Sequence, residues 1–354
     1  MKALVLSGGT GTRLRPFSHS MPKQLMPVGN KPVLEHVLDN VRAMGATEVG
    51  IIVNRWAPEI RSRIGDGSAL GIDVTYLPQD GPRGLAHTVI VAREFLGDDD
   101  FVMYLGDSML GDGDLAEISA EFQRTRPDAH VVVGKVADPR AFGVVELDRD
   151  GAVVRLEEKP ERPRSDLALT GVYFFTAAVH AAIDAIEPSA RGELEITDAI
   201  QWLVSAGARV RASQFGGYYR DTGRVEDVLE CNRKVLENLR PKISGAVEDS
   251  ELIGSVVVEA GARVVRSRIE GPAIVGAGST VVDCRVGPHT SIGDGCVLDE
   301  VAIDYSIVLD GATLTRTGGL RASLIGRHAS VGGPSEGGTR RLVLGDHSRV
   351  ETAA

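Results

Sequence analysis

The sequence predicts an α/β protein in which a doubly wound, mostly parallel sheet occupies residues 1–240 and a parallel β-helix occupies residues 241–354. Two observations carry this prediction. In the first part, short apolar runs alternate with a segment of helical periodicity, which is typical of strand–helix–strand units. In the second part, helical periodicity stops and aliphatic residues recur about every six positions, often followed by glycine.

Buried strands are expected at the short apolar or β-branched runs of the first part, which turn residues bound on both sides. These runs are Lys2–Leu6, Val49–Val53, Ile72–Leu77, Phe101–Leu105 and His130–Gly134. Between the first two, the apolar residues of 33–44 fall on one face of a helix. Because such crossovers make neighbouring strands parallel, ligands are expected in the loops that follow the strands.

One clear stretch carries the β-helix prediction. Val286, Ile292 and Leu298 are six positions apart, which suits one strand per hexad with the aliphatic side chain inside the coil. The spacing slips to five between Val281 and Val286, so an irregular solenoid is expected. The alternative is a small antiparallel β domain. The glycine-rich tract 332–341 has few apolar residues and is expected to be a mobile loop.

Composition and charge exclude several classes of protein. The 354 residues carry 39 Lys and Arg against 49 Asp and Glu, a net charge of −10, which argues against binding to nucleic acid. The three cysteines form no CxxC motif, so neither a disulfide framework nor a zinc cluster is expected, and the cytoplasm is the expected location. No stretch of about 18 apolar residues occurs, so no membrane association is expected.

The loop after the first strand, GGTGTRLRP, is expected to bind polyphosphate. Its glycines allow successive backbone N–H groups to turn toward phosphate oxygens, and Arg13 adds a full charge. The loop is not a dinucleotide fingerprint, because Leu14 replaces the third glycine, and it lacks the GK[ST] ending of a P-loop. Lys23 follows between two prolines of MPKQLMP. A plain structural turn is the alternative.

GGTGTRLRP followed by PKQLMPVGNKPVLEHVL resembles the N-terminal signature of sugar-1-phosphate nucleotidyltransferases, most closely glucose-1-phosphate thymidylyltransferases of the long, streptomycin-cluster type. The resemblance implies a Rossmann-like sheet of the GT-A type, a left-handed β-helix and a homo-oligomer. It also implies that the loop and its arginine grip the triphosphate, while the lysine of PKQL meets the phosphates that become pyrophosphate. Carried over, nucleotide binding falls on Leu6, Gly8, Gly9, Gly11 and Arg13, and Arg13 and Lys23 are catalytic.

YLPQDGPRGLAH, after the third strand, resembles the base-recognition loop of this family. The carboxamide of Gln79 can pair with adjacent N–H and C=O groups on a pyrimidine edge, and the backbone from Gly84 can approach a base closely. Both are therefore nucleotide-binding candidates. Uracil and thymine share the edge that Gln79 would read. His87 is expected on a helix surface or in packing.

Two carboxylates end strand-like runs, Asp107 in LGDS and Asp221 in YYRDTG. Mg²⁺ prefers oxygen ligands and is often held by one or two carboxylates plus substrate phosphates. Both residues match the family's metal aspartates, which makes them catalytic and Mg²⁺-binding candidates, and Asp107 also a nucleotide contact. The sequence departs from the family pattern at Ser108, where asparagine is common, and at Tyr219, where tryptophan often stands.

The next segments resemble the family's sugar and phosphate contacts. A carboxylate such as Glu158 can accept bonds from vicinal hydroxyls, whereas Lys159 and Arg191 can neutralise a phosphomonoester, and Lys159 is a catalytic candidate. Thr197 or Asp198 is expected near the pocket mouth. The sugar-phosphate candidates are Gly143, Glu158, Lys159, Tyr173, Arg191 and Tyr219.

The predicted function is Mg²⁺-dependent transfer of a nucleotidyl group, most simply from dTTP to glucose-1-phosphate. The product is expected to serve activated or deoxysugar biosynthesis, such as that of antibiotics. A phosphate dianion is already a nucleophile, so positioning and charge neutralisation suffice. The alternatives are the same reaction with UTP, GTP, ATP or a cyclitol phosphate, and a non-catalytic sugar-nucleotide sensor. A further alternative is an added acyltransferase activity that uses His289, His328 or His347 of the β-helix.

Overall fold

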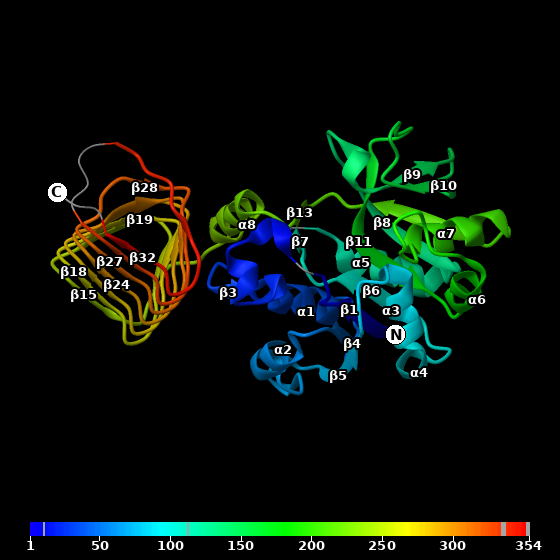
Figure 1. Cartoon of the computed structure of the whole chain (residues 1–354), viewed down its shortest axis with the longest axis horizontal. Helices are drawn as coiled ribbons and strands as arrows, with labels where there is room; N and C mark the ends of the chain where they lie inside the picture. The colour runs from blue at the N-terminus through cyan, green and yellow to red at the C-terminus, as the bar shows by residue number, and fades with distance from the viewer. Residues whose placement is uncertain (10, 112, 334–337, 352–354) are drawn as a thin grey trace. The chain divides into compact units, whose positions relative to one another are not determined.

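The computed structural model describes residues 1–9, 11–111, 113–333 and 338–351. They form two compact units that are interleaved in sequence (Figure 1). We call Met1–Gly9 with Leu34–Asp221 the sheet unit, and Thr10–Val33 with Thr222–Ala354 the solenoid unit. The predicted boundary at residue 240 stays a prediction. The short segment 10–33 is grouped with the C-terminal part of the chain rather than with its neighbours in sequence.

The sheet unit contains a nine-stranded sheet in the order β10-β9-β11-β6-β1-β4-β5, with β8 beside β11 and β12 beside β8. Its centre is parallel, because β1 pairs with both β6 and β4, and β4 pairs with β5. The five predicted strands are confirmed to within one residue at each end. They are β1 (Lys2–Leu6), β4 (Glu48–Val53), β5 (Asp73–Pro78), β6 (Phe101–Leu105) and β8 (Ala129–Lys135).

The sheet is mixed, so the expectation of a mostly parallel sheet needs correction. β11 (Leu167–Phe175) runs antiparallel to β6, β8 and β9. β9 (Gly143–Leu147) and β10 (Val153–Glu158) form an antiparallel hairpin, and β12 (Val210–Gln214) is parallel to β8. The links from β9 to β10 and from β10 to β11 are too short for the crossover that a parallel pair requires, which is about a dozen residues.

Helices cover the sheet unit. The predicted helix is confirmed as α1 (Val33–Ala43). Side chains of α3, α6 and α7 pack in one apolar cluster with side chains of the central strands, including Leu4, Phe101 and Phe175. The other helices in the described chain are α2 (Ala57–Ile64), α3 (Leu85–Val91), α4 (Arg93–Leu96), α5 (Leu115–Thr125), α6 (Ala178–Ala185), α7 (Ile196–Ser205) and α8 (Val225–Glu237).

The C-terminal part is a parallel β-helix made of three sheets, in which each strand pairs with the equivalent strand of the next coil (Figure 1). The first sheet holds β14 (Lys242–Ile243), β17 (Val256–Val258), β20 (Ala273–Val275), β23 (Thr290–Ile292), β26 (Ile307–Val308), β29 (Leu324–Ile325) and β31 (Val343–Leu344). The second holds β15 (Ala246–Glu248), β18 (Arg263–Val265), β21 (Thr280–Val282), β24 (Val297–Asp299), β27 (Thr313–Thr315), β30 (Ser330–Gly332) and β32 (Arg349–Glu351). The third holds β16 (Glu251–Ile253), β19 (Arg268–Glu270), β22 (Arg285–Val286), β25 (Ala302–Asp304) and β28 (Leu320–Arg321). The alternative of a small antiparallel domain is therefore wrong.

The slip in the hexad spacing lies between the second and third sheets of the coil. Val281 lies in the second sheet and Val286 in the third, and the same five-residue step recurs from Leu298 to Ile303. Two steps of six and one of five account for the 17 residues between stacked partners such as Val264 and Val281. Other coils depart from this length, with 16 residues from Ser291 to Ile307 and 19 from Leu324 to Val343, so the expectation of an irregular solenoid is confirmed. Inward aliphatic residues of consecutive coils touch one another and form the core.

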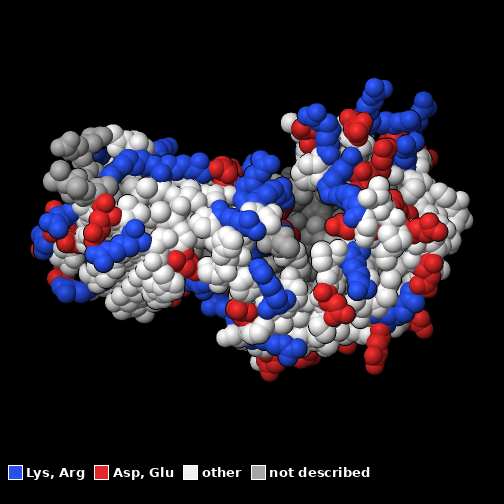
Figure 2. Space-filling model, in the orientation of Figure 1, with Lys and Arg blue, Asp and Glu red and all other residues white. Residues whose placement is uncertain are grey.

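The glycine-rich tract 332–341 lies only partly within the described chain. Gly332 ends β30, and Arg340 forms an isolated bridge with Leu320. Residues 334–337 lie outside the described residues. No helix in the part that the structure describes is long and apolar enough to cross a membrane. On the face shown in Figure 2, basic and acidic side chains are interspersed.

Candidate active site

The carboxyl end of β1 in the sheet unit lies beside the glutamine predicted to read a base. Leu6 ends β1, and the backbone N–H of Ser7 donates to the carbonyl of Ile52 at 3.0 Å. A Cβ atom built on Gly8 would lie 3.6 Å from Oε1 of Gln79, so this carboxamide reaches the first glycine of the loop. The structure therefore brings together Leu6, Gly8 and Gln79, which sequence reasoning had assigned to one nucleotide site.

His87 has a contact that sequence reasoning missed. Its Nδ1 lies 3.1 Å from Nε2 of Gln79, so the imidazole orients the carboxamide rather than only filling space. Burial and the positive charge of Arg83 lower the pKa of His87. The neutral ring can accept a hydrogen bond at Nδ1, which leaves Oε1 of Gln79 available as an acceptor. The only sign of this contact in the sequence is that Gln79 and His87 are eight residues apart. Gln79 follows the end of β5, and His87 lies in the next helix, α3.

Gly84 precedes α3 at a very close backbone crossing. Its φ is 96°, and a Cβ atom there would lie 2.3 Å from the carbonyl oxygen of Leu194. Backbone hydrogen bonds hold the crossing, from Ala86 N–H to Leu194 O at 3.1 Å and from Leu194 N–H to Arg83 O at 2.9 Å. The predicted base loop is thereby joined to the segment that carries Arg191.

The two predicted metal aspartates lie at neighbouring positions of paired strands. Asp107 follows β6 and is nearly buried, and Ser108 begins β7 (Ser108–Gly111). β13 (Tyr218–Asp221) runs antiparallel to β7, with Asp221 directly opposite Ser108. This register places Asp221 across from the residue that follows Asp107, and the convergence of the two carboxylates on one metal ion stays a prediction. In the described residues no group of three or more potential ligands from His, Cys, Asp and Glu occurs.

Tyr219 lies near these two carboxylates, and Tyr173 lies near Glu158. Burial, and then the negative charges of Asp221 and Asp107, raises the pKa of Tyr219 far above its ordinary value. Burial and the charge of Glu158 likewise raise the pKa of Tyr173. Both phenols are therefore protonated at neutral pH and can donate hydrogen bonds to a ligand oxygen. The structure brings both predicted tyrosines to the same region as the aspartates.

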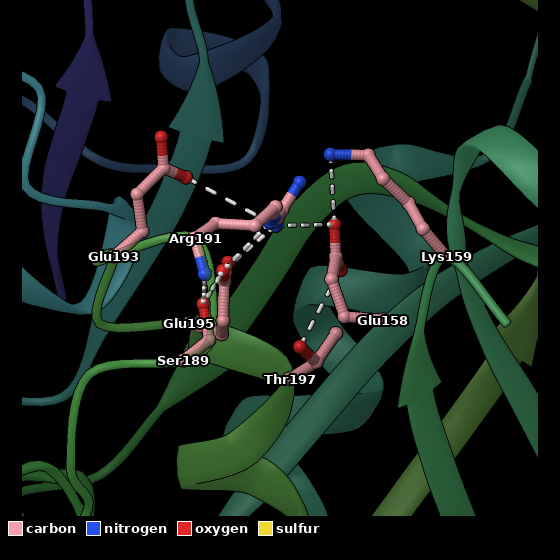
Figure 3. Close-up of polar contacts among 7 residues, drawn as sticks. All are labelled: Glu158, Lys159, Ser189, Arg191, Glu193, Glu195 and Thr197. Atoms are coloured by element: carbon pink, nitrogen blue, oxygen red, sulfur yellow. Dashed lines mark hydrogen bonds and ion pairs between the residues drawn. The ribbon is translucent and has the colours of Figure 1, made fainter.

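Three of the predicted sugar-phosphate residues, Glu158, Lys159 and Arg191, form one polar cluster in the sheet unit (Figure 3). Oε1 of Glu158 lies 3.2 Å from Lys159 Nζ and 3.3 Å from Arg191 Nη2. Thr197 Oγ1 donates to Oε2 of Glu158 at 3.4 Å. A Cβ on Gly143 would approach this same Oε2 to 3.2 Å, so the glycine leaves room for the carboxylate.

Glu195, the residue directly before α7, is a member of this cluster that sequence reasoning did not assign to the site. Its side chain is 7% exposed, and its Oε1 accepts hydrogen bonds from Arg191 at 2.7 Å and from Ser189 Oγ at 2.8 Å (Figure 3). Residues 191–195 are not helical, so the four-residue spacing of Arg191 and Glu195 gives no signal in the sequence. Burial, then the charges of Glu195 and Glu158, raises the pKa of Asp198 on the next turn.

The predicted phosphate-binding residues Gly11, Arg13 and Lys23 belong to the solenoid unit. Gly11, with φ 61°, begins the 3₁₀ turn Thr12–Leu14 that carries the exposed Arg13. A Cβ on Gly11 would lie 3.6 Å from Cβ of Lys23, so the glycine loop and the PKQL segment are packed together. Gly9, with φ 92°, is the last residue of the adjoining sheet-unit segment. Thr10 of this loop lies outside the described residues.

The solenoid histidines lie at coil corners with left-handed backbone. His289, His328 and His347 have φ values of 60°, 54° and 59°. His328 and His347 are exposed, and their rings stack on each other with centroids 5.3 Å apart. His328 and His347 thus face solvent, whereas His289 is partly buried.

The family model described as nucleotidyl transferase matches residues 2–238 of this chain. The chain is 52% identical over 356 residues to a glucose-1-phosphate thymidylyltransferase of Streptomyces griseus, covering 100% of both chains. It is 51% identical to a protein of the same name from Streptomyces antibioticus, covering 99% of both. A crystal structure of a putative glucose-1-phosphate thymidylyltransferase from Bacillus anthracis, in complex with a sucrose, aligns with TM-score 0.63 and 32% identity over 68% of this chain and 97% of that one.

Proposed function

Because this chain belongs to the nucleotidyl transferase family, we propose that its preferred substrates are dTTP and glucose-1-phosphate, which give dTDP-glucose and pyrophosphate. That it transfers a nucleotidyl group to a sugar-1-phosphate follows from its full-length relatives. The observation that carries the base preference is the carboxamide of Gln79, held by His87 beside Gly8 at the end of β1. Such a carboxamide suits the paired N–H and C=O of a pyrimidine edge.

Two carboxylates at one strand edge support Mg²⁺ binding by Asp107 and Asp221. The set fits a hard cation whose remaining ligands are phosphate oxygens and water, since Mg²⁺ rarely uses an all-protein cage. When bound, the ion neutralises charge on the substrate phosphates. Tyr219, protonated beside both carboxylates, would donate a hydrogen bond to a bound oxygen.

In the proposed reaction, an oxygen of the sugar phosphate attacks the α-phosphorus of the nucleotide. A new P–O bond forms as the bond to the β-phosphate oxygen breaks, and pyrophosphate leaves. No proton needs to be removed from the nucleophile, so the chain need not supply a general base. Catalysis then rests on positioning and charge neutralisation. Arg13 and Lys23 would bind the triphosphate and offset the negative charge on the leaving group.

The cluster around Glu158 would hold the sugar phosphate. Without ligand, its two cations, Lys159 and Arg191, face Glu158. A phosphomonoester would draw these cations away from Glu158, whose oxygens could then accept bonds from sugar hydroxyls. Glu195 keeps Arg191 in place during this exchange because it holds the guanidinium from its buried side.

A pyrophosphate-release screen tests the substrate preference. We would assay dTTP, UTP, GTP and ATP against glucose-1-phosphate, other sugar-1-phosphates and a cyclitol phosphate. The highest kcat/KM is expected for dTTP with glucose-1-phosphate, with UTP next because the two bases share one edge. Gln79→Ala should raise the KM for dTTP and reduce the preference over purines more than it lowers kcat. A clear preference for GTP or ATP, or for the cyclitol, would overturn the proposal.

The family resemblance also supports further assignments. We propose that the β-helix is left-handed, that the protein is a cytoplasmic homo-oligomer, and that its product serves activated or deoxysugar biosynthesis. Size-exclusion chromatography with light scattering tests the oligomer, and a mass equal to one chain would contradict it.

A further inference from the structure

The hairpin that follows Lys23 is anchored to the C-terminal part of the solenoid unit. β2 (Pro27–Val28) pairs with β3 (Lys31–Pro32) across a two-residue turn in which Gly29 and Asn30 have φ near 60°. The N–H of Gly29 donates to Oδ1 of Asn232 on α8 at 2.8 Å. Nδ2 of Asn30 donates to the carbonyl of Ile292 in the β-helix at 2.6 Å.

Asn232 links three parts of the solenoid unit. It is fully buried, and its Oδ1 also accepts from the hydroxyl of Ser291 at 2.7 Å. Its Nδ2 donates to the carbonyl of His289 at 3.3 Å. One amide thus connects the hairpin turn, helix α8 and a coil of the β-helix. Because a buried amide is costly to leave without partners, this arrangement resists displacement of the turn.

A second anchor lies just before Lys23. Nη2 of Arg327 donates to the carbonyl of Ser20 at 3.1 Å, and Nε of Arg327 donates to Asp346 at 2.8 Å. The side chain of Asp346 is 3% exposed. Burial raises its pKa, but hydrogen bonds from Arg327 and Ser20 outweigh burial, and the net shift is downward. The carboxylate is therefore charged and holds the guanidinium in position.

The two anchors lie on either side of Lys23 in sequence. Between Ser20 and Gly29 the chain contains Pro22 and the 3₁₀ turn Lys23–Leu25, which leave little slack. The packing of Gly11 against Lys23 extends the support to the loop that carries Arg13. We infer that the β-helix positions the phosphate-binding segment, with Asn232, Asn30 and Arg327 as positioning residues. The inference rests on the proposed role of Lys23 in binding the nucleotide phosphates.

The test measures four parameters for each variant of the full chain: KM for dTTP, KM for glucose-1-phosphate, KM for pyrophosphate in the reverse reaction, and kcat. Asn232→Ala removes the amide that joins the three parts. Asn30→Gly is the milder variant, because glycine retains the left-handed turn and only the anchor to Ile292 is lost. Ser267→Ala is the matched control, since that buried hydroxyl accepts the N–H of Cys284 within the solenoid at 3.0 Å.

We expect Asn232→Ala to raise the KM for dTTP and for pyrophosphate about tenfold, and Asn30→Gly to raise both about threefold, as losses of one to a few buried hydrogen bonds allow. The KM for glucose-1-phosphate should change less than about twofold, and Ser267→Ala should change none of them by more, because it leaves both anchors intact. In a Lys23→Ala background, Asn232→Ala should add no further increase, because both changes act through one side chain.

The outcomes separate the inference from the proposed function. If Lys23→Ala raises both KM values but Asn232→Ala and Asn30→Gly do not, the inference is overturned and the proposed role of Lys23 stands. If Lys23→Ala itself leaves both values unchanged, that role fails and the inference fails with it. Fully additive effects of Lys23→Ala and Asn232→Ala, or an equal rise for all three substrates, would show a merely structural contribution and would also overturn the inference.

Discussion

Substitution of Gly84 by alanine tests whether the base loop needs its close backbone crossing. The added methyl group would lie 2.3 Å from the carbonyl oxygen of Leu194 and 2.6 Å from its nitrogen, and these backbone atoms cannot move aside by a rotamer change. The φ of 96° is also a conformation that alanine adopts only under strain. The loop must therefore shift away from Leu194.

These contacts give the expected loss in the free energy of unfolding. Backbone strain contributes about 1–3 kcal/mol. The two crossing hydrogen bonds, Ala86 N–H to Leu194 O and Leu194 N–H to Arg83 O, contribute about 1 kcal/mol each if they break. A total of about 3–5 kcal/mol corresponds to a fall in Tm of about 10 °C for a unit of this size. If the loop opens partly, the fall in Tm would be smaller and the KM for dTTP would rise instead.

Thermal unfolding by circular dichroism and the KM for dTTP together check this prediction. Gly84→Ala should lower Tm, raise the KM for dTTP about tenfold or both, since the loop is proposed to contact the base. Gly81→Ala is the matched control in the same loop, because a Cβ there meets no atom within 4 Å. The reasoning is refuted if Gly84→Ala and Gly81→Ala have the same Tm and the same KM.

Two further predictions concern the carboxylates and the base-reading pair. Asp107→Asn or Asp221→Asn should reduce kcat at least about a hundredfold with an unchanged circular dichroism spectrum, because each removes a carboxylate that would hold the Mg²⁺ whose positive charge offsets phosphate repulsion; near wild-type turnover at limiting Mg²⁺ would contradict the metal assignment. His87 has a lowered pKa, so its neutral form is favoured in the folded protein and its bond to Gln79 is present at neutral pH. As pH falls through that pKa, below 6.5, Nδ1 gains a proton, the bond is lost and the KM for dTTP should rise, whereas His87→Gln should show no such rise.

Much of the sheet unit was predictable because burial imposes a simple pattern. β1 and β6 are central parallel strands, so their apolar runs coincide with the strands to the residue. β11, which pairs with β6, is also an apolar run, but nothing within a strand states the direction of its partners. Its antiparallel pairing with β6 depends on how the chain returns through β8, β9 and β10, which the residues of β11 do not encode.

The site was predictable where residue types combine with position after a strand, as at Asp107 and Gln79. It was not predictable where the contacting residue is far away in sequence or belongs to no recognisable motif. Glu195 looks like the start of a helix, and its contact with Arg191 depends on how the preceding loop turns. Asn232 is one polar residue on an amphipathic helix, and only the fold shows that it meets Gly29, 203 positions earlier.

The contact between Arg327 and Ser20 spans 307 residues, and it concerns the order in which the chain is made. A ribosome adding about 5–20 residues per second would take on the order of 15–60 s between these two positions. During that interval the strands of the parallel core, from β1 to β6, have already left the ribosome and can pair. The segment around Lys23 is among the first to be synthesised, yet Arg327, in the coil before last, is among the last. The contact with Ser20 can therefore form only when synthesis is nearly complete, after Asn232 and Ile292 of the first anchor have been made.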